Sequence, residues 1–273
     1  MKQIRLTLST LLAILLLSTG SFASDTLFMA TTTSTDNTGL LDYLSPHFTN
    51  DTGITLKWTA TGTGKALKLG QNCDADVLLV HAPSAEKKFV ADGFGSGRRE
   101  IMYNDFVIIG PAADKAGIKG KSVSDALTLI KKAATPFVSR GDNSGTNKKE
   151  IKLWENANLQ IPDKEKWYVQ TGQGMLSTIN ATSERKGYTM TDRGTYIKYE
   201  HNNGGKAPLV ILVEGDKTLK NQYSVIPVNT NNCPKVKNTL AVKFSDWLAG
   251  KNAQKLIGEF KLLGKQLFTP NAK

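Results

Sequence analysis

The ten residues "DADVLLVHAP", Asp74 to Pro83, decide the class of fold. Four aliphatic residues stand in succession between Asp76 and His81, and a helix-like segment follows Pro83. A short apolar run without alternation is typical of a strand buried on both faces, as in a parallel sheet covered by helices. The run therefore predicts an α/β protein.

Strand-like and helix-like segments alternate on both sides of this run. The predicted strands share aliphatic or β-branched runs and cover residues 26–31, 54–61, 75–83, 99–111, 135–141, 167–169 and 223–229. The predicted helices share an apolar face and cover residues 39–53, 65–72, 84–93, 122–134, 146–158, 174–187 and a long stretch, 236–260, broken near Gly250. A chain of 273 residues built in this way predicts two α/β lobes, with ligand bound where loops leave the carboxyl ends of strands.

The N-terminus has the pattern of an export signal. Lys2 and Arg5 precede an apolar run, and the small residue Ala23 closes the segment. This pattern predicts a signal peptide over residues 1–23, because its apolar run is shorter than the roughly 20 residues of a membrane span. We therefore expect an exported, soluble protein.

Charge and cysteine content limit the partners. The net charge is +11, but the lysines are scattered and no basic stripe interleaved with aromatic residues occurs, so we do not expect nucleic-acid binding. A positive field can still steer a small anion toward a cleft.

Export permits a disulfide between Cys73 and Cys233, but sequence separation does not reveal whether they meet, so free thiols remain an alternative. No histidine stands at metal-ligand spacing, and we expect no metal site.

The run of hydroxyls "TTTST" follows the first predicted strand. The start of a helix offers free backbone N–H groups to an anion, and the hydroxyls of Thr32, Thr33 and Ser34 add donors without charge. The alternative is that Thr35 or Asp36 is a simple helix cap. A cap explains one such residue, not the whole run, so we expect Thr35 or Asp36 to cap the helix and Thr32, Thr33 and Ser34 to belong to the site.

The second unusual turn is "TATGTGKAL". It is no nucleotide phosphate loop, because Thr59 stands where that loop needs glycine and Ala66 where it needs Ser or Thr. Thr63 is placed to donate to an anion at the top of a short helix. A plain glycine turn remains the alternative.

The third turn is "SRGDNSGT". Arg140 leaves a strand, and Ser144, Gly145 and Thr146 open a helix. A guanidinium gives paired donors to an oxyanion, and the helix start gives more. We expect Asp142 to orient Arg140 by accepting its outer N–H groups.

Signs of an enzyme are weak. The only histidines are His47, His81 and His201, and no carboxylate pair suggests acid–base catalysis. We expect a binding protein without a cofactor. The alternatives are an exported hydrolase that uses a serine of these turns with His81, and a binding module for an organic acid.

These turns resemble those of known anion-binding proteins. The Arg140 and Ser144-Gly145-Thr146 pattern resembles that of periplasmic phosphate-binding proteins, and "ATGTGKAL" with "DADVLLVHAP" resembles molybdate- and phosphate-binding proteins. The segments "ATTTSTDNTGLLDYL", "DADVLLVHAP", "IMYNDFVIIGP", "SRGDNSGT" and "MTDRGTY", in this order, are most similar to the substrate-binding proteins of tungstate ABC importers.

The resemblance implies a type II periplasmic binding-protein fold that captures tungstate for an ABC permease and its ATPase. We expect a monomer with one lobe over residues 24–105 and 224–273 and a second over residues 106–223. The expected oxyanion ligands are Thr32, Thr33, Ser34, Thr63, Arg140, Ser144, Gly145 and Thr146, with His81 as a further candidate.

Two departures bear on the ligand. His81 stands where phosphate binders place a carboxylate, and Asn147 stands where we expect histidine in the tungstate group. Phosphate is partly protonated near neutral pH and benefits from an acceptor, whereas tungstate, molybdate and sulfate need only donors. A mismatched donor or acceptor costs about 1–3 kcal/mol, which disfavours phosphate. Molybdate and sulfate remain alternatives to tungstate.

Overall fold

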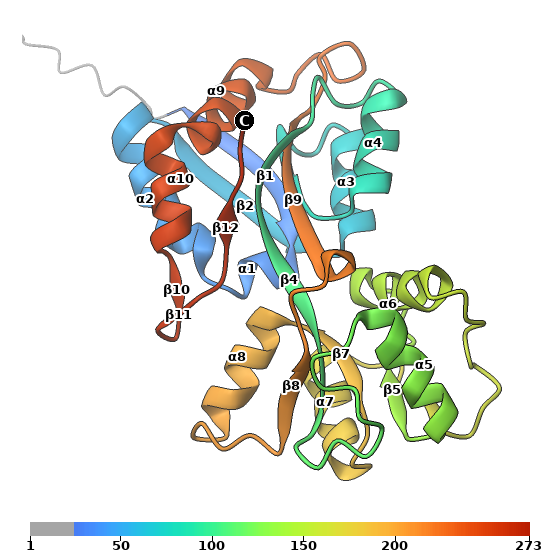
Figure 1. Ribbon diagram of the computed structural model, residues 1–273. Coiled ribbons are helices and arrows are strands. Elements are labelled where there is room, and N and C mark those ends of the chain that lie inside the picture. The colour runs from blue at the N-terminus through green and yellow to red at the C-terminus, as the bar shows by residue number, and fades with distance from the viewer. Residues whose placement is uncertain (1–24) are drawn as a thin grey trace, which may run out of the picture.

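A computed structural model describes residues 25–273, so the predicted signal peptide, residues 1–23, lies outside the described residues. Two α/β lobes lie one above the other in Figure 1, and one long strand, β4 (Arg99–Pro111), runs from the upper lobe into the lower. The predicted two-lobed α/β fold is confirmed. Among residues 25–273, no helix combines the length and apolar character needed to cross a membrane.

One mixed sheet joins the lobes. In the first lobe its order is β12-β4-β9-β3-β1-β2, and β7 and β8 pair with the far half of β4 in the second lobe. The other strands of this sheet are β1 (Thr26–Thr32), β2 (Thr55–Thr61), β3 (Val77–Val80), β7 (Thr189–Asp192), β8 (Leu209–Val213), β9 (Lys220–Pro227) and β12 (Thr269–Pro270). The apolar run that forms β3 pairs with β1 in parallel, as predicted, whereas β9 is antiparallel to both β3 and β4.

Two small sheets complete the strands. β5 (Phe137–Ser139) pairs in parallel with β6 (Tyr168–Gln170) in the second lobe. β10 (Lys261–Leu262) and β11 (Lys265–Gln266) form a short antiparallel pair near the C-terminus.

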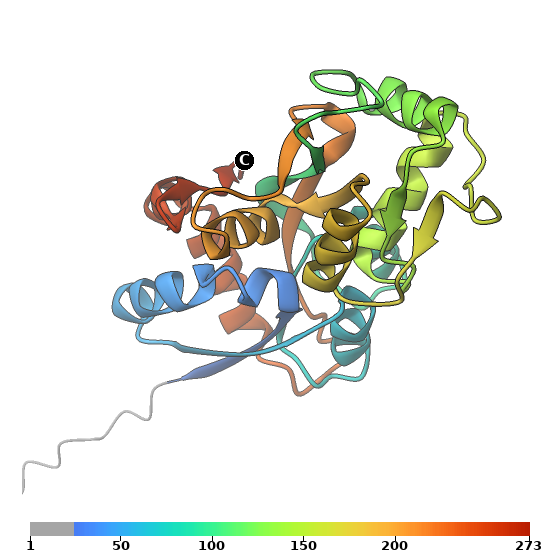
Figure 2. The ribbon, with the colours of Figure 1, turned by 90° about the horizontal axis from the view of Figure 1, so that it is seen from below.

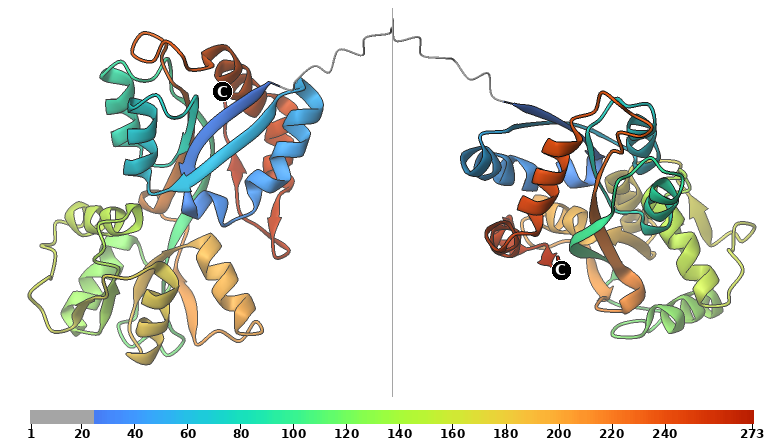
Figure 3. Two further views of the ribbon diagram at one scale, coloured as in Figure 1. Left: turned by 180° about the vertical axis from the view of Figure 1, so that it is seen from behind. Right: turned by 90° about the horizontal axis from the view of Figure 1, so that it is seen from above.

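Helices surround both lobes (Figure 3). Those of the first lobe are α1 (Thr33–Asp36), α2 (Leu40–Thr52), α3 (Thr63–Gln71), α4 (Pro83–Ala91), α9 (Asn238–Ala249) and α10 (Lys251–Glu259). Those of the second are α5 (Val123–Ala133), α6 (Gly145–Asn156), α7 (Met175–Glu184), α8 (Arg193–Asn202) and the 3-10 turn η1 (Lys217–Leu219). The expected break at Gly250 separates α9 from α10, and both helices cover the first lobe.

Each lobe has its own hydrophobic core. In the first lobe Phe48, Phe244 and Phe268 are fully buried on one face of the sheet, and a second cluster around Leu78 fills the other face. In the second lobe the fully buried indole of Trp154 packs among aromatic and aliphatic neighbours. Burial of this kind contributes about 25 cal/mol per Å² of apolar surface, so each lobe has its own source of stability.

Helix α8 also connects the two lobes. Its Ile197 is buried in the first-lobe core, and the ammonium of Lys198 donates to the carbonyl of Asn37 at the end of α1. Figure 2 shows α8 next to the N-terminal helices of the first lobe. The lobes are therefore in contact along α8 as well as through β4.

A disulfide joins Cys73 and Cys233, which settles the pairing that the sequence left open. Cys73 follows α3, and Cys233 is fully buried in the loop after β9, so the bond links segments 160 residues apart within the first lobe.

We predict that replacing both cysteines with alanine lowers the free energy of unfolding by about 2–4 kcal/mol, because the unfolded chain regains the freedom that the cross-link removes. Urea unfolding of the two proteins measures the difference. A reducing agent should move the wild-type midpoint toward that of Cys73→Ala/Cys233→Ala and leave the variant unchanged. Equal urea midpoints for the wild type and the double variant before reduction would contradict the prediction.

Candidate anion-binding site

The turns singled out in the sequence lie on the facing sides of the two lobes. β1 and β2 run toward the second lobe, and α6 lies on the side of the second lobe nearest to them (Figures 1 and 3). The turns after β1 and β2 belong to the first lobe, and the turn before α6 belongs to the second.

The hydroxyl run forms a tight cluster at the start of α1. The Oγ1 of Thr32 accepts from the backbone N–H of Thr35 at 3.2 Å and lies 2.7 Å from the Thr35 hydroxyl and 3.1 Å from the Ser34 hydroxyl. Thr32 is nearly fully buried, whereas Thr33 is exposed at the first position of the helix. Thr32 and Ser34 are therefore brought together, and Thr33 presents its side chain to solvent.

The prediction that Thr35 or Asp36 caps this helix is wrong. Thr32 is the cap, because its extended backbone allows its hydroxyl to reach the N–H of Thr35. Thr35 is fully buried inside the turn, and the carboxylate of Asp36 instead accepts from the indole of Trp58 at 2.7 Å. The longer helix α2 begins separately, after Gly39.

His81 lies at the end of β3 against this cluster. Its Nε2 lies 3.0 Å from the Ser34 hydroxyl and 3.1 Å from the Thr32 hydroxyl, and its Nδ1 lies 3.0 Å from the Oδ1 of Asn221. Burial lowers the pKa of His81, although Asn221 and the nearby Asp192 oppose this. At neutral pH the ring is therefore neutral and can donate from only one of its nitrogens.

Thr63 begins α3 at the end of β2. The cap of this helix is Gly62, which offers no side chain to the first-turn N–H groups. Those N–H groups lack partners within the helix, and they carry the positive end of the helix dipole. Thr63 is half-buried beside them, so this turn can donate to an anion.

The turn after β5 holds the second-lobe group. The Nη2 of Arg140 donates to the carboxylate of Asp142 at 2.5 Å, which confirms the expected pairing. The Nε of Arg140 is buried and has no acceptor among the residues that the structure describes. An unsatisfied buried donor costs about 1–3 kcal/mol, so this nitrogen favours a ligand that brings an acceptor.

Ser144 caps α6. Its hydroxyl accepts from the N–H of Asn147 at 3.3 Å, and its own N–H donates to Asp142 at 3.1 Å. Gly145 and Thr146 form the first turn behind it. Burial alone would raise the pKa of Asp142, but hydrogen bonds from Ser144 and the charge of Arg140 lower it overall.

The buried carboxylate of Glu150 stabilises the turn between β5 and α6. Glu150 accepts from the hydroxyl of Ser139, from the indole of Trp154 at 2.9 Å and from the hydroxyl of Tyr168 at 2.7 Å. The Oγ of Ser139 in turn accepts from the side chain of Asn147 at 3.2 Å. The side chain of Asn147 therefore stabilises the turn between β5 and α6. Burial raises the pKa of Glu150, against these hydrogen bonds.

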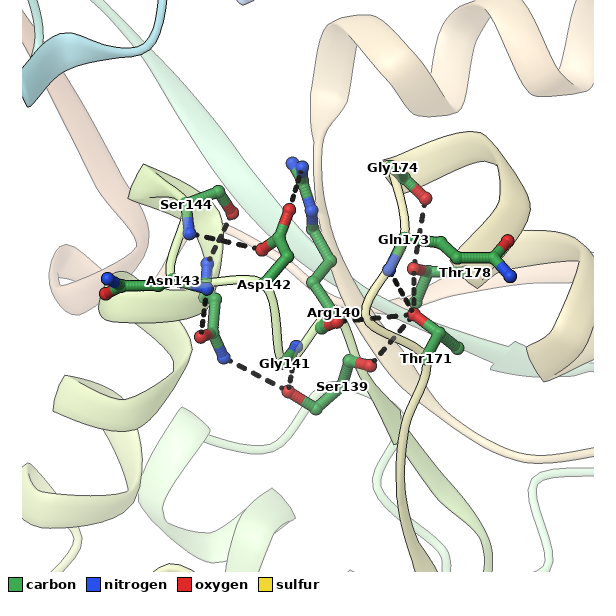
Figure 4. A network of polar contacts seen from close by, with 11 residues as sticks. Ser139, Arg140, Gly141, Asp142, Asn143, Ser144, Thr171, Gln173, Gly174 and Thr178 are labelled. Atoms are coloured by element: carbon green, nitrogen blue, oxygen red, sulfur yellow. Dashed lines mark hydrogen bonds and ion pairs between the residues drawn. The ribbon is translucent and has the colours of Figure 1, made fainter. Parts of the chain in front are cut away.

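The sequence analysis missed a fourth turn, "TGQG", which follows β6. The N–H of Thr171 donates to Ser139 and that of Gly172 donates to the carbonyl of Arg140, at 3.1 and 2.8 Å. Figure 4 shows Arg140 between Ser144 on one side and Gly174, the cap of α7, on the other. The sequence contained a signal for this turn. In "TGQG", as in "TGTG" at the start of α3, a strand is followed by Thr-Gly-X-Gly and then by a helix.

Arg140 can occupy this position because Gly141 follows it. Gly141 has a φ of +59°, and a Cβ there would lie 2.7 Å from the Cβ of Gln170. No L-residue with a side chain fits this turn without displacing β6.

The site therefore has two halves, each built from hydrogen-bond donors. Thr32, Ser34 and His81 meet in the first lobe, and Arg140 and Ser144 meet through Asp142 in the second. Within residues 25–273, no hydrogen bond joins the two halves directly, and no cluster of His, Cys, Asp or Glu could hold a metal ion. Such an arrangement can surround a small oxyanion with donors.

The fold and the site define a two-lobed solute-binding protein, and comparison with known proteins agrees. The model of a family described as the PBP superfamily domain matches residues 18–252, so the chain belongs to this superfamily.

Particular relatives are more specific. The tungstate-binding protein TupA of Campylobacter jejuni is 52% identical over 240 residues, which cover 88% of this chain and 89% of that protein. The structure of the tungstate-binding protein TupA from Desulfovibrio alaskensis G20 has 66% identity and a TM-score of 0.89, covering 91% of this chain and all of that one. A structure described as the tungstate ABC transporter from Geobacter sulfurreducens has 47% identity and a TM-score of 0.75, covering 86% and 98% of the two chains.

We predict that Asp142→Asn lowers the free energy of unfolding at about pH 7 by about 1.5 kcal/mol, the lower range for a hydrogen bond to a charged group. The pKa of Asp142 is lowered in the folded state, so its contribution is fully present above the ordinary value of 3.8 and is lost as the pH falls through the folded-state pKa. The difference between wild type and variant in urea unfolding should therefore narrow below that pH. A constant difference at all pH values would contradict this assignment.

Proposed function

We propose that this chain captures tungstate in the periplasm and delivers it to an ABC permease and its ATPase. The names of the relatives support this, since the proteins from Campylobacter jejuni and Desulfovibrio alaskensis are both described as tungstate-binding. The observation that carries the proposal within this chain is the buried Nε of Arg140, which lacks an acceptor in the turn that opens α6. The chain is a binding protein rather than an enzyme.

The donor chemistry supports a proton-free oxyanion. The proposed ligands share backbone N–H, hydroxyl or guanidinium donors, and they are Thr33, Ser34, Thr63, Arg140, Ser144, Gly145 and Thr146. Thr32 and His81, proposed with them from the sequence, lie in the same first-lobe cluster, where they contact each other and support Ser34. The carboxylates near these groups are engaged: Asp142 accepts from Arg140 and Ser144, and Asp192, near His81, accepts from Thr195. Hydrogenphosphate would bring a proton that finds no free acceptor.

Closure of the lobes would complete the site. We assign one lobe to residues 24–105 and 224–273 and the other to residues 106–223, and a monomer suffices because each half of the site comes from one chain. Binding between the lobes would favour the closed form by the difference in affinity between the two states.

One contact bears on the alternative of an exported hydrolase. The Ser34 hydroxyl and His81 Nε2 are within hydrogen-bond reach, as a serine nucleophile requires. The group behind the ring is the amide of Asn221 rather than a carboxylate, so it offers no charge to stabilise the imidazolium. Turnover of phosphate or acyl esters by pure protein would support the hydrolase.

We predict that calorimetric titration finds tight binding of tungstate and molybdate, weaker binding of sulfate and the weakest binding of phosphate. The mismatch of about 1–3 kcal/mol for a protonated anion corresponds to at least about a fivefold loss. Tungstate and molybdate are alike in size and charge, so we expect them to bind more similarly to each other than either does to phosphate. Absence of binding by every tetrahedral oxyanion at micromolar concentrations would refute the proposal.

Arg140→Ala should weaken tungstate binding by about 1.5–3 kcal/mol, roughly 10- to 150-fold, because charge-assisted hydrogen bonds are lost. The matched control is Arg185→Ala, which removes an exposed arginine at the end of α7 in the same lobe and should leave the affinity unchanged. Calorimetry gives the affinities, and circular dichroism checks that both variants are folded. Equal effects of the two substitutions would remove Arg140 from the site.

A further inference from the structure

Asn221 lies at the point where the hinge strands meet the hydroxyl cluster. It is the second residue of β9, is 94% buried, and stands directly opposite Asn104 of β4. Its Nδ2 donates to the Oδ1 of Asn104 at 2.8 Å and to the hydroxyl of Tyr223 at 3.3 Å. Its Oδ1 therefore faces the Nδ1 of His81 as an acceptor.

This orientation determines where the proton of His81 lies. A neutral imidazole has one N–H donor and one acceptor nitrogen. Since the Oδ1 of Asn221 can only accept, the proton is on Nδ1, and Nε2 is the acceptor. The ring also stacks on Tyr223, with centroids 4.7 Å apart, which holds its plane.

The acceptor Nε2 takes its proton from Thr32. The Oγ1 of Thr32 accepts the N–H of Thr35 and lies 2.7 Å from the Thr35 hydroxyl. With the Thr35 hydroxyl as the donor of that second bond, both lone pairs of Thr32 are occupied and its own proton points to His81. The hydroxyl of Thr35 in turn meets that of Tyr223. These contacts form a closed circle of polar groups from Asn221 through Tyr223, Thr35, Thr32 and His81 back to Asn221.

Ser34 lies outside this circle. Its hydroxyl is 3.0 Å from Nε2, but the proton of Thr32 already fills that lone pair. The other oxygen within reach of Ser34, the Oγ1 of Thr32 at 3.1 Å, has both lone pairs occupied in this arrangement, so the Ser34 proton is available to a ligand. The lone pair of Nε2, which would otherwise repel an oxyanion, is covered.

We propose that Asn221 is a positioning residue for anion binding: it fixes His81 as the Nδ1–H tautomer, which turns the Thr32 hydroxyl inward and leaves Ser34 free to donate to the anion. The role of Ser34 rests on the proposed function, whereas the tautomer of His81 does not. The same arrangement leaves no open acceptor in the first-lobe half for the proton of hydrogenphosphate.

The test combines NMR with calorimetry. In protein labelled with ¹⁵N-histidine, the long-range ¹H–¹⁵N spectrum distinguishes the two tautomers, and the signals of His81 are those that disappear in His81→Gln. Wild type should show the Nδ1–H form, and this measurement needs no substitution in the circle. Finding the Nε2–H form would overturn the proposal.

Asn221→Leu should remove this preference and weaken tungstate binding about three- to tenfold, the range of one net hydrogen bond, because Ser34 can then donate to His81 instead. The matched control is Gln222→Met, the next residue of β9, whose buried amide bonds to Met102 and Asn271. Gln222→Met should leave both the Nδ1–H tautomer of His81 and the affinity for tungstate unchanged.

An Asn221→Leu protein that folds and retains both the Nδ1–H tautomer of His81 and the wild-type affinity for tungstate would overturn the proposal. If wild type shows the Nδ1–H form but binds no tetrahedral oxyanion, the proposed function fails instead, so the two failures are distinguishable.

Discussion

The antiparallel pairing of β4 with β9 is the constraint on which both lobes and the site depend. β4 pairs with β9 and β12 in the first lobe and with β7 and β8 in the second, so one strand holds both halves of the molecule in register. A shift of one residue would turn every side chain of β9 to the opposite face. Asn221 would then leave His81, and the hydroxyl cluster would lose its fixed arrangement.

The site recognises an anion with donors and helix ends more than with net charge. Arg140 and Asp142 nearly neutralise each other, and the remaining donors are hydroxyls and backbone N–H groups. Fixed dipoles of this kind stabilise a desolvated anion only if they cannot rotate away. Glu150 supplies that rigidity in the second lobe, and the circle through His81 supplies it in the first.

Much of the fold followed from local patterns. Apolar periodicity predicted most of the strands and helices, including the break at Gly250, because side-chain spacing reflects local backbone geometry. The predicted elements did not include β7, α8 or β8. The capping prediction at Thr35 or Asp36 was wrong, since several hydroxyls compete and only the bend of the chain selects Thr32. The turn "TGQG" went unnoticed because its contacts with Arg140 arise only when β6 pairs with β5.

The sequence by itself determined the α/β class, the candidate oxyanion turns and the partnership of Arg140 with Asp142, all of which depend on residues close together in the chain. Only the tertiary structure decided that Cys73 pairs with Cys233 and that Asn221 faces His81. These partners are 160 and 140 residues apart. Contacts at such separations depend on strand register and packing, which local propensity does not encode.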